Sequence, residues 1–81
     1  MSELGNTIKR HRERLKMSLS MAAEEACLSK AQVWDLEKGR TSNPTVGTLY
    51  RLGLAIGCKP LDLAKAALAD RHRSYEEGNG A

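Results

Sequence analysis

Helix start and stop signals recur at short intervals along this 81-residue chain, and they constrain its fold more than any other feature. The clearest instance is the segment SKAQVWDLEKG, from Ser29 to Gly39. Ser29 followed three residues later by Gln32 is typical of a capping box, which satisfies two free N–H groups at a helix start. Gly39 supplies the left-handed residue that commonly ends a helix. The segment therefore predicts one short helix, from about Lys30 to Lys38.

The rest of the chain carries similar signals. Leu4, Ile8, His11 and Leu15 lie at helical spacing, and Ser18, Thr45 and Pro60 are residues that start helices. The predicted helices span residues about 4–16, 19–26, 30–38, 46–56 and 60–70. The buried stripe of the fourth helix is predicted to be Val46, Leu49, Leu52, Gly53 and Ile56. Since alternating β-branched runs are nearly absent, we expect an all-α fold with five helices.

The domain organisation is simple. Residues 4–70 are expected to form one domain, because a chain of this size has no room for a second. Residues 71–81 (RHRSYEEGNGA) have few apolar groups and end in Gly-Asn-Gly before the final alanine, which predicts a flexible tail. The N-terminal residues lack the apolar core of a signal peptide, and no apolar run is long enough to cross a bilayer. We therefore expect a cytoplasmic protein.

The charge pattern suggests a polyanionic partner. The net charge is +3 and the pI about 9.1, and residues 9–16 (KRHRERLK) carry five basic residues and one acid. Such a run suits phosphates, or it is an ordinary solvated helix face. His11 within it is interpreted as a partly buried packing residue, because it has no metal-binding partners nearby in the sequence.

Enzymatic and metal-dependent functions have no support in the residue pattern. Cys27 and Cys58 lie 31 residues apart without a CxxC motif, and both have apolar neighbours in the sequence, so they are expected to be reduced, buried thiols. The sequence has no activated nucleophile, carboxylate pair or phosphate-cradling glycine loop. We therefore predict a protein that is not an enzyme and has no metal, cofactor or evident small-molecule ligand.

The second and third predicted helices, joined by a short turn, have the arrangement of a helix-turn-helix motif. From Leu4 to about Leu63 the chain resembles the lambda-repressor-like family of helix-turn-helix DNA-binding domains. The matching stretches are LGNTIKRHRERLKMS, SLSMAAEEACLS, SKAQVWDLEKG and NPTVGTLYRLGLAIGCKPLDL. The chain has Cys27 in the turn where the family usually has glycine. A positive φ there would cost about 1–2 kcal/mol.

The resemblance implies a set of site residues. It implies that Arg12 and Glu37 pair between the first and third helices, and that the third helix enters the major groove. On the outer side of that helix lie the candidates for reading bases: Lys30, Ala31, Gln32, Trp34 and Asp35. Candidates for phosphate contacts lie at helix starts and in the following loop: Ser18, Ser29, Lys38, Arg40, Thr41, Asn43 and Thr45.

Two of these side chains also have simpler interpretations. Trp34 either contacts DNA or packs on the first helix or on Arg40. Asp35 either accepts a hydrogen bond from a cytosine amino group or pairs with Lys38 or Arg40.

The resemblance also implies a twofold dimer that binds an inverted-repeat operator on double-stranded DNA. Tyr50, Leu54, Leu61 and Leu68 form the candidate dimer interface, or some of them fold onto the domain's own core. The function expected is transcriptional regulation, most simply repression or autoregulation, with an antitoxin that represses its own operon as a subtype. The alternative is a protein-interaction module that uses the same scaffold.

Overall fold

The computed structural model describes residues 2–41 and 44–79, with side chains through residue 72. Within them the chain forms five helices and no strand, which confirms the predicted all-α fold. The helices are α1 (Glu3–Arg14), α2 (Leu19–Ala26), α3 (Lys30–Glu37), α4 (Val46–Ile56) and α5 (Pro60–Asn79). No helix in these ranges is long and apolar enough to cross a membrane.

Local capping explains where the helices begin and end. Four hydroxyl side chains each accept a hydrogen bond from the backbone N–H three residues later, which satisfies a donor that has no partner within the helix. These residues are Ser2, Ser18, Ser29 and Thr45. Gly57 ends α4 with φ of 70°, a left-handed conformation that glycine adopts without steric cost.

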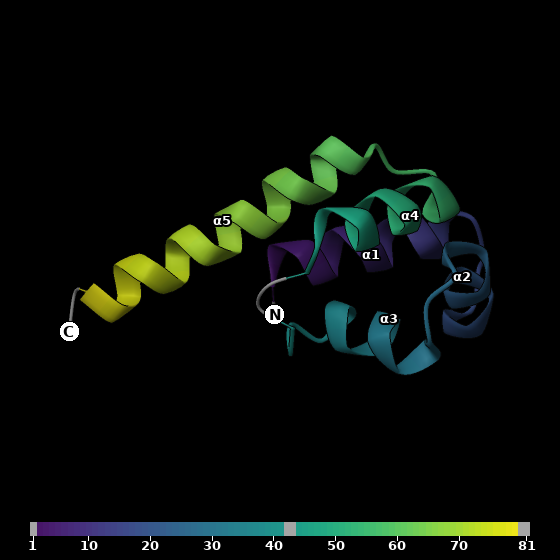
Figure 1. The fold of residues 1–81 in the computed structure, drawn as a ribbon, viewed down its shortest axis with the longest axis horizontal. Coiled ribbons are helices and arrows are strands. Elements are labelled where there is room, and N and C mark those ends of the chain that lie inside the picture. The colour runs from purple at the N-terminus through teal and green to yellow at the C-terminus, as the bar shows by residue number, and fades with distance from the viewer. Residues whose placement is uncertain (1, 42–43, 80–81) are drawn as a thin grey trace.

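The core lies where all five helices meet. Its largest fully buried side chains, with at least one from every helix except α2, are Ile8, Val33, Leu52, Ile56 and Leu63. Helix α2 contributes small buried alanines. In Figure 1, α3 forms the lower edge of the molecule, α2 one end, and α5 runs along the opposite side. Helix α3 therefore packs against the core with one face only, and the opposite face of α3 points outward.

The thiol of Cys58 is part of this core and is 4% exposed. Burial raises the pKa of the Cys58 thiol, because a thiolate would be poorly solvated there. The residue therefore packs as a small apolar group. Cys27 is also a free cysteine but is exposed, so the expectation of two buried thiols holds only for Cys58.

Two expectations about α4 and α5 are wrong. Val46 was expected on the buried stripe of α4 but is 83% exposed, because it is the first residue of the helix and the core on this side begins at Leu49. Helix α5 was expected to end near residue 70 but continues to Asn79, so residues 71–79 are helical. This segment contains helix-forming Arg and Glu with no proline, and a helix once started gains a hydrogen bond with each added residue. It projects beyond the other helices (Figure 1).

Candidate nucleic-acid interface

The turn between α2 and α3 depends on an unusual conformation at Cys27. This residue has φ of 57° and ψ of 41°, in the left-handed region. The next N–H, from Leu28, donates to the Ala23 carbonyl at 2.8 Å, which closes the end of α2. Ala22, Ala23 and Ala26 are all buried, so α3 and α4 can approach α2 closely. The anticipated steric cost at Cys27 is therefore present, and the chain adopts helix-turn-helix geometry despite it.

The start of α3 is fixed by the predicted capping box. The Gln32 N–H donates to Ser29 Oγ at 3.1 Å, and the Ser29 N–H donates to Gln32 Oε1 at 2.8 Å. The side-chain amide oxygen of Gln32 therefore already accepts a hydrogen bond within the protein, whereas its NH₂ group takes no part in the capping box. A bidentate contact with adenine needs both groups. To make that contact, the Gln32 oxygen would have to accept from adenine as well as from the Ser29 N–H, or lose its hydrogen bond to Ser29.

The inner face of α3 is anchored by a bidentate ion pair. Arg12 Nε donates to Glu37 Oε2 at 2.8 Å, and Arg12 Nη2 donates to Glu37 Oε1 at 3.0 Å. The remaining nitrogen, Nη1, donates to the Met17 carbonyl at 2.7 Å. The hydrogen bond to Glu37 raises the pKa of the Arg12 guanidinium, so the positive charge persists throughout the ordinary pH range. The resemblance implied this pair, and the structure brings the two side chains together across α1 and α3.

The outer face of α3 is open. Lys30, Ala31 and Gln32 are exposed, Asp35 is half-buried, and Trp34 is 41% exposed. One face of α3 is therefore fixed by contacts within the domain. The other face exposes basic, apolar, amide and aromatic side chains.

The ring of Trp34 lies under the side chain of Lys38. The Lys38 ammonium lies 4.7 Å from the centre of the Trp34 ring, a cation–π contact typically worth about 0.5–1 kcal/mol at an exposed site. Within the described residues Asp35 forms no ion pair with Lys38 or Arg40. Its backbone carbonyl instead accepts from the Arg40 N–H at 2.9 Å.

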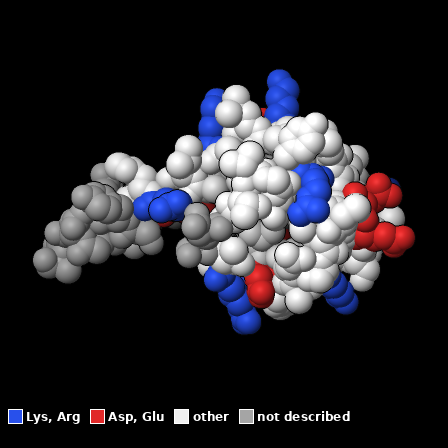
Figure 2. Space-filling view, viewed as in Figure 1, with Lys and Arg blue, Asp and Glu red and all other residues white. Residues whose placement is uncertain are grey.

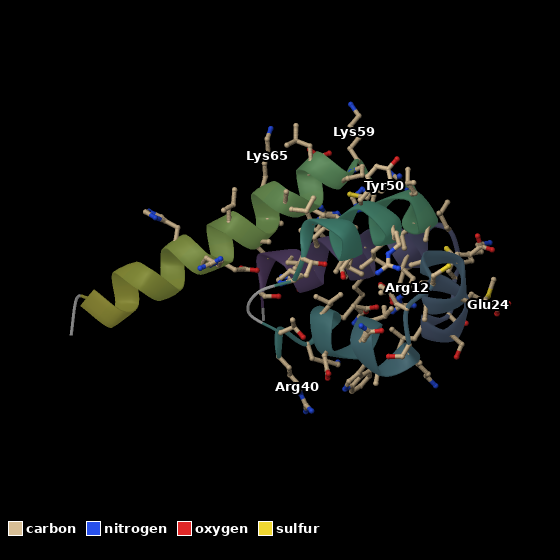
Figure 3. All side chains as sticks on the ribbon, viewed as in Figure 1. Arg12, Glu24, Arg40, Tyr50, Lys59 and Lys65 are labelled. Atoms are coloured by element: carbon tan, nitrogen blue, oxygen red, sulfur yellow. The ribbon has the colours of Figure 1, made fainter. Side chains whose placement is uncertain are left out.

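The predicted phosphate-binding residues form two groups. Ser18, Ser29 and Thr45 are helix caps whose oxygens already accept from backbone N–H groups. Lys38, Arg40 and Thr41 are exposed beyond the buried part of α3, and Asn43 lies outside the described residues. Arg40 extends from the lower edge of the domain (Figure 3).

Charge is unevenly distributed over the visible face. Figure 2 shows Lys and Arg side chains at several separate places, and acidic side chains gathered at the end formed by α2, which carries the exposed Glu24 and Glu25. The basic residues thus form no single patch in this view. The basic residues on α3 and directly after it are Lys30, Lys38 and Arg40.

The predicted dimer-interface residues are all exposed on α4 and α5. Exposure is 55% for Tyr50, 63% for Leu54, 64% for Leu61 and 65% for Leu68. Val46 was not predicted to join them, but it lies one turn before Tyr50 on α4, and its exposure assigns it to the same set. We call these five side chains the α4–α5 apolar group. Figure 3 places Tyr50 on the upper side of the domain and Arg40 at its lower edge.

The comparisons with known proteins agree with this geometry. The chain matches the helix-turn-helix domain family over residues 3–71 and belongs to it, in agreement with the lambda-repressor-like resemblance. Among solved structures, it is similar to the N-terminal DNA-binding domain of SinR from Bacillus subtilis. The two are 26% identical, with a TM-score of 0.71, over 75% of this chain and 88% of that one. No curated protein matches the chain.

Proposed function

We propose that this protein is a sequence-specific DNA-binding transcriptional regulator that inserts α3 into the major groove. The observation that carries this proposal is the contrast across α3, whose inner face is anchored by Arg12 and Glu37 while Lys30 and Trp34 remain exposed. A major groove admits one α-helix, and a helix held from behind presents its side chains there in a fixed orientation. The similarity to the SinR DNA-binding domain supports the same proposal.

The residue types on the outer face suit base edges. Lys30 lies at the first position of α3 and would donate to guanine O6 and N7. Ala31 is small enough to contact a thymine methyl group, and Asp35 would accept from the cytosine amino group. Gln32 would read adenine through its free NH₂ group. Trp34, covered on one side by Lys38, would pack against sugar or a thymine methyl with its exposed edge.

Phosphate contacts would come from the edges of the motif. Lys38, Arg40, Thr41 and Asn43 follow or end α3, and such contacts fix the register of the protein on the duplex without specifying sequence. The hydroxyls of the caps, Ser18, Ser29 and Thr45, mark helix N-termini, where backbone N–H groups favour anions. Contacts of this kind would position the protein on the duplex without reading bases.

The α4–α5 apolar group would join two copies of the chain around a twofold axis. Specific interfaces bury roughly 800 Å² per partner, usually around apolar anchors, and this group supplies exposed anchors of that kind. The dimer would bind an inverted repeat with half-sites about one helical turn apart. Repression, including repression of its own promoter, is the regulatory outcome we propose.

The proposal is tested by selecting binders from a library of random duplexes and following affinity against salt concentration. We expect enrichment of an inverted repeat and a steep loss of affinity with salt, because each phosphate contact releases counterions. No enrichment together with a shallow salt slope would instead support the protein-interaction alternative.

A further inference from the structure

The first turn of α1 is held by a residue from the far end of the chain. The Asp70 carboxylate on α5 accepts hydrogen bonds from the backbone N–H groups of Glu3 at 2.7 Å and Leu4 at 3.0 Å. Ser2 Oγ accepts from the next one, that of Gly5, at 2.8 Å. The three N–H groups that lack partners within α1 are therefore satisfied, two of them by α5.

The same turn lies directly against the end of α3. A Cβ atom on Gly5 would overlap the Glu37 carbonyl oxygen and would lie 2.8 Å from the carbonyl carbon. Gly39, with φ of +73°, is close enough to Ser2 that a Cβ there would lie 3.3 Å from the Ser2 side chain. With so little free space, the start of α1 cannot shift without moving the end of α3 and the chain that leads to Arg40.

These contacts connect the two surfaces that a dimeric regulator needs. Helix α5 carries Leu61 and Leu68 of the α4–α5 apolar group, and the same helix carries Asp70. Asp70 holds the start of α1, which in turn supports the end of α3. An interface on α5 would therefore be connected to α3 by this carboxylate and the turn that it caps, in addition to the core packing of Leu63 and Ala66.

We propose that Asp70 is a positioning residue that fixes the separation and rotation of the two α3 helices in the dimer, and so sets the half-site spacing that the protein accepts. This inference rests on the proposed function. One base pair of added spacing moves a half-site by roughly 3.4 Å and rotates it by roughly 35° about the duplex axis. If α3 is rigidly connected to the dimer interface, such a change in spacing lowers the affinity. If the connection is loose, the two α3 helices can adjust and the affinity changes little.

The experiment compares the full chain with Asp70→Ala on the selected inverted repeat and on versions with one base pair added or removed. We expect the wild type to discriminate between spacings, and Asp70→Ala to reduce that discrimination by about fivefold or more, the lower end of typical coupling between sites. Affinity for a single half-site and its preferred sequence should not change. Asp70→Glu, which keeps the carboxylate, should restore part of the discrimination.

Controls separate the possible outcomes. Asp62→Ala removes another carboxylate from α5 and should leave the spacing preference unchanged. Circular dichroism shows whether Asp70→Ala is folded at the assay temperature. If it is not, the spacing preference is measured instead for Asp70→Asn, which retains one acceptor oxygen. A folded variant that loses affinity equally at all spacings, or keeps full discrimination, overturns the role of Asp70. A wild type that binds all spacings equally overturns the dimeric function, and the inference with it.

Discussion

The inner and outer faces of α3 differ in how far their polar groups are already committed. On the inner face, each carboxylate oxygen of Glu37 already accepts a hydrogen bond from the Arg12 guanidinium. On the outer face, Lys30 and Ala31 are exposed, and Trp34 has only Lys38 over its ring. One face therefore determines where the helix lies, and the other keeps its chemistry for a partner. Mutations should separate the two faces into effects on stability and effects on binding.

The largest effect is expected at the inner face. Glu37→Ala should lower the free energy of unfolding by about 3–5 kcal/mol, because it leaves the Arg12 charge partly buried without its partner. That is a large share of the stability of an 81-residue domain, roughly 4–12 kcal/mol. Denaturant unfolding followed by circular dichroism measures the change. The double variant Arg12→Met with Glu37→Leu should be much less destabilised than the sum of the single changes. A loss below about 1 kcal/mol for Glu37→Ala would mean that the pair behaves as a surface pair.

The pH dependence of this pair follows from Arg12. Because its folded-state pKa is raised by the Glu37 hydrogen bond, its contribution to stability is fully present below the unfolded-state pKa. It is lost only as pH rises through the higher folded-state value. Unfolding measured across neutral and mildly alkaline pH should therefore show the same difference between Glu37→Ala and the wild type.

A second inner-face effect is expected where α1 meets the end of α3. Gly5→Ala should lower the free energy of unfolding by about 3 kcal/mol, because the added methyl group overlaps the backbone of Glu37 rather than a movable side chain. Gly47→Ala is the control, since the space around Gly47 is open apart from the Thr45 hydroxyl at 3.9 Å. It should be neutral or slightly stabilising in thermal unfolding. Equal losses for both variants would contradict the close packing at Gly5.

The inner face also shows which features the sequence could predict. Caps such as Ser29 with Gln32 are local signals within three residues, and they predict where most of the helices begin. The pairing of Arg12 with Glu37 came from a family resemblance. The cap that Asp70 provides could not be predicted, because it joins backbone groups 66 and 67 residues away. Val46 was misassigned because periodicity identifies a face of a helix but not where the core under that face ends.

The outer face offers the test on binding. Lys30→Ala should weaken binding by about 1–3 kcal/mol, mainly at one base position in each half-site, and should change stability by less than about 0.5 kcal/mol. Arg40→Ala should instead weaken binding to all sequences alike and reduce the salt slope by about 1. Titrations on a set of operators with single base changes distinguish the two. Equal losses on every sequence for both variants would show that Lys30 contacts the backbone and reads no base.

The smallest effect is expected in the turn that leads into α3, which belongs to the scaffold and not to the reading face. Cys27→Gly removes a left-handed strain of about 1–2 kcal/mol but adds unfolded-state entropy worth about 0.4–1 kcal/mol. The net gain in unfolding free energy should be about 1 kcal/mol or less, with DNA affinity unchanged. Cys27→Ala keeps the Cβ atom and should give no gain. If alanine stabilised the domain as much as glycine, the cost would lie in the thiol and not in the backbone. If Cys27→Gly altered sequence preference, the turn would control the outer face as well, and the separation between the two faces would not hold.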